Sequence, residues 1–258
     1  MENSKNISVL TLGCPKNVVD SEKLISALGA NGFTVVDNID KSETCIINTC
    51  GFIKPAVEEN LEVILKVVNL KVQGKLQKVI VAGCLVERFK EILRREFNEV
   101  DLFVGVESLE QVVRYLKSDA QLKSQLLGER QLLTPKHYAY LKVSEGCNRE
   151  CAFCAIPNIR GRLRSIPIPN LVEEATSLAR KGVRELIIVS QDTSSYGIDI
   201  YGEPKLLHLL KELVAIPGIS WIRIMYLYPA GIPDGLIDFV AHEPKICNYF
   251  DIPIQHIS

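Results

Sequence analysis

The feature that most constrains the fold is a regular alternation between short apolar runs and longer segments with helical periodicity. In the first part of the chain the runs are rich in Val and Ile and do not alternate with polar residues, which is typical of parallel strands covered on both faces. Strands are predicted at 7–12, 33–36, 44–49, 78–82 and 102–104. Helices are predicted at about 18–30, 55–72, 85–96 and 108–117, the last with Ser108 as a cap. This succession predicts an α/β fold with an open parallel sheet and helices on both sides.

The same alternation resumes after a polar stretch without clear periodicity, which we interpret as a linker. The later strands are predicted at 138–143, 185–190, 221–226 and 249–252. The later helices are predicted at 170–181, 205–215 and 233–242. Four strands of this kind, with nothing to close them, leave a strand edge uncovered. We therefore expect the chain to be a fragment of a longer protein.

Composition and charge exclude several classes of protein. Of the 258 residues, 47% are hydrophobic and 24% are charged, which is close to the globular average and argues against disorder. Thirty basic residues face 31 acidic ones, so bulk charge does not favour coating of nucleic acid or of an anionic membrane. The sequence has neither an apolar run that could span a membrane nor a signal peptide. We expect a cytoplasmic protein without a membrane partner.

Eight cysteines are unusual for such a chain, and they indicate metal binding, redox chemistry or simple burial. Cys147, Cys151 and Cys154 form a Cys-x-x-x-Cys-x-x-Cys motif directly after a predicted strand. Such a loop can hold three corners of a 4Fe-4S cube and leaves the fourth iron open for a substrate or cofactor. Zinc is the alternative, but a structural zinc site needs four ligands, and His137 lies on the far side of the strand. The spacing favours iron–sulfur.

Three more cysteines each follow a different predicted strand and have a glycine neighbour, namely Cys14, Cys50 and Cys84. The carboxyl ends of parallel strands share one edge of the sheet, where ligands bind. We therefore expect the three to converge as ligands of a second cluster, again with one open iron. The alternative is three buried thiols that happen to begin loops. Cys45 and Cys247 are expected to be inert thiols of the core or of a loop.

Two further loops carry polar side chains with the potential to bind. The run Arg-Gly-Arg-Leu-Arg at 160–164 contains no acidic residue, so it could bind a carboxylate, a phosphate or an acidic partner, although an ordinary solvated turn remains an alternative. The segment 191–197 follows a predicted strand, at the end where a barrel enzyme keeps its catalytic groups. As a loop of turn-forming residues, it could equally be structural.

The cysteine triplet, with Phe153 before its last member and a βα repeat after it, resembles that of the radical S-adenosylmethionine (SAM) enzymes. With the three strand-end cysteines added, the whole chain resembles the methylthiotransferases. Leu-Gly-Cys-Pro-Lys-Asn at 12–17, Ser-Glu-Gly-Cys-Asn at 144–148 and Ser-Gln-Asp-Thr-Ser-Ser-Tyr-Gly at 190–197 are similar to the RimO type. The tRNA-modifying MiaB type typically has Gly-Cys-Gln-Met-Asn at the first of these motifs.

The resemblance implies an N-terminal methylthiotransferase domain at 1–118, a linker at 119–137 and an incomplete radical SAM domain at 138–258, the first part of a partial (β/α) barrel. Its closing strands and a C-terminal small β-barrel domain would lie beyond the chain. The implied cofactors are SAM and two 4Fe-4S clusters, one on Cys147, Cys151 and Cys154 and the other on Cys14, Cys50 and Cys84. Phe153 would pack beside the adenine of SAM, and Gln191 would contact this cofactor.

The activity that the resemblance implies is addition of a methylthio group to the β-carbon of an aspartate in a small-subunit ribosomal protein. No side-chain acid or base ionises such a C–H bond, so a radical derived from SAM is needed. The implied partners are the ribosomal protein and an external one-electron donor, with nucleic acid involved only indirectly. Two alternatives remain: a tRNA methylthiotransferase with the same ligands, and a noncatalytic iron–sulfur or zinc protein. The activity of the fragment alone is left open.

Overall fold

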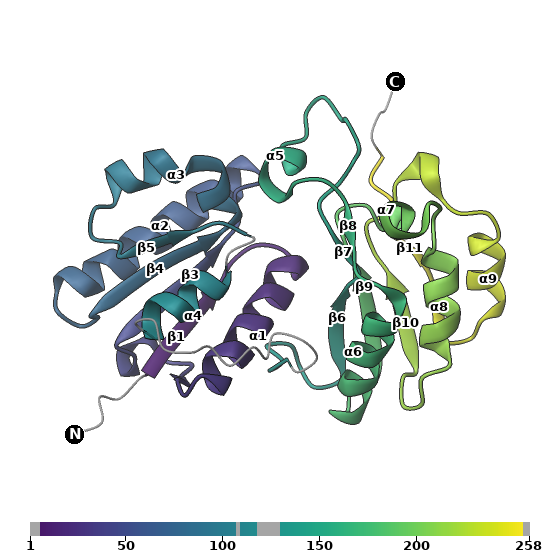
Figure 1. Ribbon diagram of the computed structural model, residues 1–258, viewed down its shortest axis with the longest axis horizontal. Coiled ribbons are helices and arrows are strands. Elements are labelled where there is room, and N and C mark those ends of the chain that lie inside the picture. The colour runs from purple at the N-terminus through teal and green to yellow at the C-terminus, as the bar shows by residue number, and fades with distance from the viewer. Residues whose placement is uncertain (1–5, 107–108, 118–129, 255–258) are drawn as a thin grey trace. The chain divides into compact units, whose positions relative to one another are not determined.

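The computed structural model describes residues 6–106, 109–117 and 130–254. They form two compact units, one reaching to Gln131 and including Asn158–Arg160, the other made of Leu132–Pro157 and the chain from Gly161 onward. Each unit is built on its own parallel sheet with helices packed against it (Figure 1). The expected linker at 119–137 lies outside the described residues as far as position 129. Arg130, where the description resumes, is buried and forms an ion pair with Glu22 in the first unit.

The first unit contains five parallel strands in the order β2-β1-β3-β4-β5. These strands are β1 Asn6–Thr11, β2 Thr34–Val35, β3 Thr44–Thr49, β4 Lys78–Gly83 and β5 Leu102–Val104. The order reverses between β1 and β3, since β2 lies on one side of β1 and all later strands lie on the other. The loops that leave the carboxyl ends at such a switch point are where open α/β sheets bind ligands.

Four helices cover the two faces of this sheet: α1 Pro15–Ala30, α2 Lys54–Val72, α3 Cys84–Glu96 and α4 Leu109–Lys117. Both α1 and α2 have a proline in the first turn, where its fixed φ suits a helix and no N–H is needed. Ile47 packs with Ile64 of α2 and Leu85 of α3, whereas its neighbour Ile46 packs with Leu24 of α1. Successive strand residues thus point to opposite faces. This confirms the open sheet with helices on both sides; Ser108 lies outside the described residues.

The second unit contains four parallel strands in the order β11-β10-β9-β6. They are β6 Tyr138–Lys142, β9 Glu185–Val189, β10 Trp221–Ile224 and β11 Ile246–Phe250. The helices between them are α6 Ile168–Arg180, α8 Leu206–Val214 and α9 Leu236–His242, and they share one buried core with the sheet. Within the described residues the strands pair in chain order and do not close a ring, which confirms the partial (β/α) barrel.

The second unit also contains elements that the pattern did not predict. They are the antiparallel pair β7 Ser144–Glu145 and β8 Arg164–Ser165, the helices α5 Ile156–Arg160 and α7 Ile198–Tyr201, and the 3-10 turns at Thr193–Ser195 and Pro229–Gly231; a third turn, Ile39–Lys41, lies in the first unit. The predicted position of the last strand, 249–252, is also wrong, because β11 begins at Ile246 and ends at Phe250. It pairs Ile222 with Ile246 and Ile224 with Phe250 across an irregularity in the register. Cys247 therefore lies within β11 rather than before a strand.

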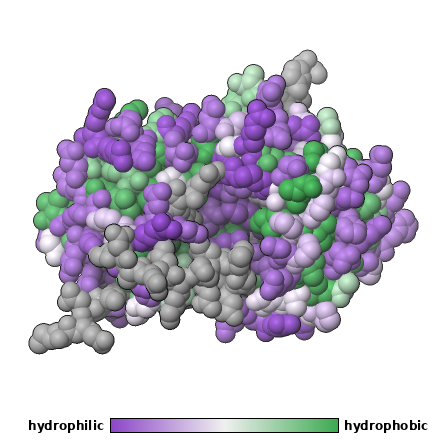
Figure 2. Space-filling view, in the orientation of Figure 1, coloured by the Kyte–Doolittle hydropathy of each residue, from purple (hydrophilic) through white to green (hydrophobic). Residues whose placement is uncertain are grey.

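No helix within 6–106, 109–117 and 130–254 is both long enough and apolar enough to cross a bilayer. On the face that Figure 2 shows, hydrophilic side chains predominate over both units and hydrophobic ones form small separate groups. Scattered apolar side chains of this kind are normal on a protein surface and need no partner.

Candidate functional site

The three N-terminal cysteines lie in neighbouring loops at the carboxyl edge of the first sheet. Cys14 caps α1 after β1, Cys50 follows β3, and Cys84 begins α3 after β4. Because β1, β3 and β4 are adjacent in the sheet, their loops are neighbours as well. A Cβ added to Gly13 would lie 2.4 Å from the Cβ of Cys50, and one added to Gly51 would lie 2.8 Å from the carbonyl oxygen of Cys84. The loop of Cys14 therefore packs against the side chain of Cys50, and the loops of Cys50 and Cys84 pack backbone against backbone.

Asn17 connects two of these thiols. Its side-chain oxygen lies 3.9 Å from the sulfur of Cys14 and 3.9 Å from the sulfur of Cys84. Its side-chain nitrogen donates hydrogen bonds to the carbonyl oxygens of Leu12 and Thr49, at 2.8 and 3.0 Å. These two bonds identify the nitrogen and thereby fix the direction of the oxygen. The fully buried amide holds both cysteine loops in one arrangement.

The protonation of these thiols reflects their burial. Burial raises the pKa of Cys84 to about 11, and the nearby Arg160 guanidinium partly opposes this rise. Burial also raises the pKa of Cys50, and the neighbouring thiols raise the pKa values of both groups further, by smaller effects. The three sulfur atoms are thus within electrostatic reach of one another. A thiol must lose its proton to bind iron, so metal binding here is coupled to proton release.

The second set of cysteines lies in the loop that leaves β7. Cys147 accepts a hydrogen bond from the backbone N–H of Arg149, with 3.3 Å between nitrogen and sulfur. The backbone N–H of Cys154 donates to the carbonyl oxygen of Cys151 at 3.0 Å, which closes a tight turn. All three thiols are half-buried. The pKa of Cys147 is raised by burial and, to a smaller extent, by Asp192 and the other two thiols, so the triplet faces one small region.

Gly146 directly precedes Cys147 and packs closely against the backbone of Gly161 and Arg162. Its φ is +73°, and a Cβ at this position would lie 2.1 Å from the carbonyl oxygen of Arg162. A side chain is excluded both by the left-handed conformation and by the neighbouring backbone. The N–H of Cys147 then donates to the carbonyl oxygen of Gly161 at 3.1 Å. Backbone contacts therefore help to fix the start of the triplet.

Polar side chains join the cysteine loop to the loop after β9. The side-chain nitrogen of Gln191 donates to Glu145 at 2.6 Å. Arg149 donates from Nε to the carboxylate of Asp192 at 2.8 Å, and its guanidinium lies 4.2 Å from the ring centre of Tyr228. Asp192 is almost fully buried, so this charge pair holds the two loops together. The structure thus places Gln191 beside the cysteine loop.

Several side chains around the cysteine triplet are suited to binding SAM. The side-chain oxygens of Gln191 and Ser144 are buried and accept no hydrogen bond from any described residue. Such acceptors suit a ligand that carries an amino group. Phe153 is 74% exposed and offers a free ring face beside the thiols. In the described part of the chain, no three Cys, His, Asp or Glu side chains already lie in the arrangement that a single metal ion needs.

The basic run at 160–164 does not form a common anion site. Arg160 is buried, only 2% exposed, and its guanidinium pairs with Asp20 at 3.0 Å. Arg162 and Arg164 are exposed. Arg160 is therefore neither a solvated turn residue nor open to a phosphate or an acidic partner, because the carboxylate of Asp20 occupies its guanidinium. Among the residues that position the two sites, the sequence reasoning missed Arg160, Asn17, Glu145 and Arg149. For Arg149 the sequence does offer a signal, since this residue is a positive charge between Cys147 and Cys151, and Asp192 carries the opposite charge.

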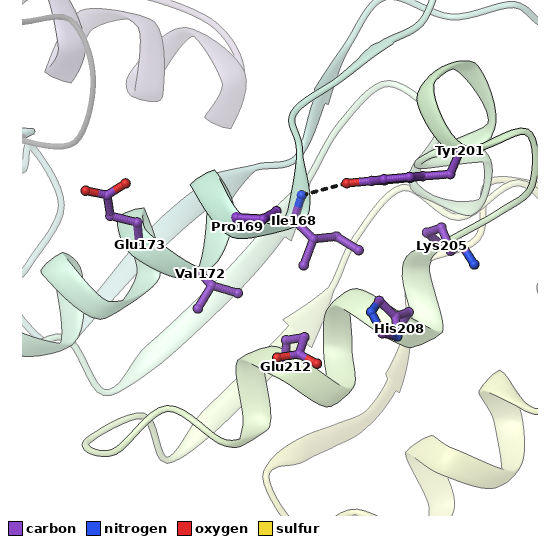
Figure 3. Close-up of a pocket in the computed structure, with 8 residues that line it drawn as sticks. All are labelled: Ile168, Pro169, Val172, Glu173, Tyr201, Lys205, His208 and Glu212. Carbon is purple, nitrogen blue, oxygen red and sulfur yellow. Dashed lines mark hydrogen bonds between the residues drawn. The ribbon is translucent and has the colours of Figure 1, made fainter.

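A groove of about 750 Å³ lies on the helical side of the second unit (Figure 3). Side chains of α6 and α8 line it, among them Val172, His208 and Glu212. At one end the hydroxyl of Tyr201 accepts a hydrogen bond from the backbone N–H of Ile168 at 3.0 Å. Neither a cysteine nor a residue of the 191–197 loop lines the groove, so it is separate from the candidate sites.

Two family models match the chain. One, described as Uncharacterized protein family UPF0004, matches residues 6–105, and the other, Radical SAM superfamily, matches residues 141–258. The ribosomal protein uS12 methylthiotransferase RimO of Christiangramia forsetii is 49% identical over 98% of this chain and 55% of its own length. The protein of the same name from Aquifex aeolicus is 49% identical over 98% of this chain and 56% of its own length. The chain thus spans a little over half the length of these relatives.

Solved structures resemble the chain at much lower sequence identity. The radical SAM methyltransferase TsrM of Kitasatospora setae, solved with cobalamin and a [4Fe-4S] cluster, matches 99% of this chain and 62% of its own, with a TM-score of 0.68 and 15% identity. The cobalamin-dependent SAM radical enzyme OxsB matches 94% of this chain and 40% of its own, with a TM-score of 0.55 and 12% identity. At these identities the likeness concerns the fold.

Fold, cysteine motif and matches together define a radical SAM domain at residues 141–258. Within that class, the whole chain is similar to the methylthiotransferases named RimO.

Proposed function

We propose that the protein is a SAM-dependent methylthiotransferase that modifies the β-carbon of an aspartate in ribosomal protein uS12. The relatives that carry this name are 49% identical to the chain over nearly all of it. The structural observation that carries the proposal is the presence of two separate sets of three cysteines, one in the loops at the carboxyl edge of the first parallel sheet and the other in the loop that leaves β7 of the second unit. One set suffices to bind the cluster that activates SAM. The second set suits a cluster whose open iron carries the sulfur to be transferred.

Each residue then has a stated task. Cys147, Cys151 and Cys154 hold the radical SAM cluster, and Cys14, Cys50 and Cys84 hold the second. With SAM bound, the first cluster supplies the carbon radical that can attack an unactivated C–H bond. Gln191 accepts a hydrogen bond from the amino group of SAM through its buried oxygen, which has no partner among the described residues. Phe153 packs its exposed ring against the adenine.

The domain assignment and the partners complete the proposal. Residues 1–118 form the methylthiotransferase domain, 119–137 the linker and 138–258 the radical SAM domain. The substrate is ribosomal, so the protein works in the cytoplasm, and it takes its electron from a separate one-electron donor.

The test is an anaerobic assay of the reconstituted chain with SAM, dithionite and purified uS12. The full-length Aquifex aeolicus relative is the positive control, and tRNA replaces uS12 in a parallel reaction. Cys151→Ala should abolish reductive cleavage of SAM. Cys14→Ala should retain cleavage but lose transfer to uS12, and Cys247→Ala, in a half-buried residue outside both sets, should retain both. Mass spectrometry locates the methylthio group on the product.

Three outcomes would contradict parts of this proposal. A methylthio group on tRNA but not on uS12 in the reaction of the chain, while the control modifies uS12, would replace the substrate by that of the MiaB type. Failure of the chain to cleave SAM under conditions where the control does so would leave a noncatalytic iron–sulfur protein. Unchanged transfer by Cys14→Ala would remove the second cluster from the reaction.

A further inference from the structure

Arg160 is a buried cation that donates hydrogen bonds to side chains around the N-terminal cysteines. It lies in the short segment Asn158–Arg160, which belongs to the first unit. Its Nε donates to the sulfur of Cys84 at 3.2 Å. Its two terminal nitrogens donate to Asp20 at 3.0 Å and to the side-chain oxygen of Asn17 at 2.5 Å. One planar guanidinium therefore bonds to three different side chains at once.

Each partner limits the freedom of this guanidinium. Asp20 supplies the negative charge that a buried arginine needs. The oxygen of Asn17 is directed toward Arg160 because its side-chain nitrogen is bound to two backbone carbonyls. With both terminal nitrogens held, the remaining Nε–H points at the sulfur of Cys84. Lysine has no planar fork and could keep the charge but not all three bonds.

The position of the hydrogen bond matters because Cys84 is a ligand of the second cluster in the function proposed above. Hydrogen bonds to the sulfur ligands and the net charge around a cluster set its reduction potential. A donor with a positive charge on a ligating sulfur stabilises the reduced, more negative cluster. It also fixes the direction of the thiolate, as outer partners of metal ligands generally do.

We propose that Arg160 is a positioning residue of the N-terminal cluster, which holds the sulfur of Cys84 in place and raises the reduction potential of that cluster. The inference rests on the proposed function, since it takes Cys84 as a cluster ligand. It gives Arg160 an internal role in place of the external anion site that the basic run suggested.

The experiment isolates the N-terminal cluster by replacing Cys147, Cys151 and Cys154 together with alanine in the full chain. After anaerobic reconstitution, the remaining cluster is titrated with dithionite and followed by electron paramagnetic resonance (EPR). Arg160→Met removes the charge and all donors at similar side-chain length. Arg162→Met makes the same change at an exposed arginine two positions away.

The expected result is a reduction potential shifted to more negative values in Arg160→Met, with a smaller shift in Arg160→Lys and none in Arg162→Met. An unchanged potential in Arg160→Met with full iron content would overturn the inference. A parent that assembles no cluster on the remaining cysteines would instead overturn the proposed function, and the inference with it. These two failures are therefore distinguishable.

A second measurement does not depend on whether the Arg160→Met variant folds. The same triple-alanine parent is grown with ¹⁵N-labelled arginine, and its reduced cluster is examined by pulsed EPR. The Nε–H bond to Cys84 predicts a weak ¹⁵N coupling, which should disappear in Arg160→Lys and persist in Arg162→Met. Absence of this coupling in the parent would overturn the inference.

Discussion

Replacing Gly83 by alanine should destabilise the first unit by more than the strain of an alanine in the left-handed region alone. Gly83 is the last residue of β4, directly before Cys84, and its φ is +98°. A Cβ there would lie 2.6 Å from the carbonyl oxygen of Thr49 and 2.9 Å from its backbone nitrogen. These are backbone atoms of the adjacent strand β3, so they cannot rotate away as a side chain could.

The magnitude has two parts. Alanine in the left-handed region costs about 1–2 kcal/mol. Overlap with the backbone adds about 1–3 kcal/mol, the usual range for overpacking in a rigid core. The free energy of unfolding should therefore fall by about 2–5 kcal/mol, a large share of the stability of an ordinary domain.

Two other glycines of the first unit provide matched controls. Gly74 has a φ of +74° but no described atom within 4 Å of an added Cβ, so Gly74→Ala should cost only the strain of about 1–2 kcal/mol. Gly29 lies inside α1 without a positive φ and also has open space, so Gly29→Ala should stabilise by about 0.5–1 kcal/mol.

The assay is urea unfolding of the metal-free protein followed by far-UV circular dichroism, with midpoints compared at similar slopes. The reasoning would be refuted if Gly83→Ala were no more destabilising than Gly74→Ala. That result would mean that the backbone of β3 does not approach Gly83 as described. It would also remove the reason to expect the loops of Cys50 and Cys84 to be held together.

Further predictions concern the core and the second cysteine loop. Cys45 should resist iodoacetamide in the folded protein at pH 8, because burial raises its pKa to about 11 and leaves about one thiolate in a thousand; mass spectrometry should detect labelling only as the pH approaches 11 or after unfolding. Ile46→Ala, at a fully buried position, should cost about 2–5 kcal/mol in urea unfolding. Val72→Ala, at an exposed one, should change stability by less than about 0.5 kcal/mol, and equal effects would contradict the assigned core. Arg149→Met removes the partner of buried Asp192, so the triplet should lose iron faster during anaerobic gel filtration, and unchanged retention would contradict its positioning role.

Much of the fold can be predicted from the sequence because each strand has a pattern of apolar residues that is visible in its own short segment. β3 and β4 each contain an apolar run, at 45–47 and 79–82, and helices flank them with clear periodicity. The convergence of the N-terminal cysteines needs one more fact, the order of strands in the sheet. That order is set by packing between distant segments, so local periodicity alone leaves it open. The general rule that parallel strands end at a common edge was enough to bring Cys14, Cys50 and Cys84 into neighbouring loops.

The surroundings of these cysteines could not be predicted in the same way. Asp20, the ionic partner of Arg160, lies 140 positions earlier in the chain, so nothing in the neighbourhood of Arg160 indicates a buried ion pair. The register of β11 depends on an irregularity opposite Ile222 and Ile224, which a two-residue period does not foresee. Both features arise from tertiary contacts, which a local pattern does not contain.

The central claim is that each set of three cysteines holds its own cluster. The most direct test is iron and sulfide analysis with Mössbauer spectroscopy of the anaerobically reconstituted chain, together with its Cys14→Ala and Cys151→Ala variants. Two independent clusters predict roughly eight irons in the parent and roughly four in each variant, all as 4Fe-4S. Roughly four irons in the parent, lost entirely in Cys151→Ala and fully retained in Cys14→Ala, would contradict the claim.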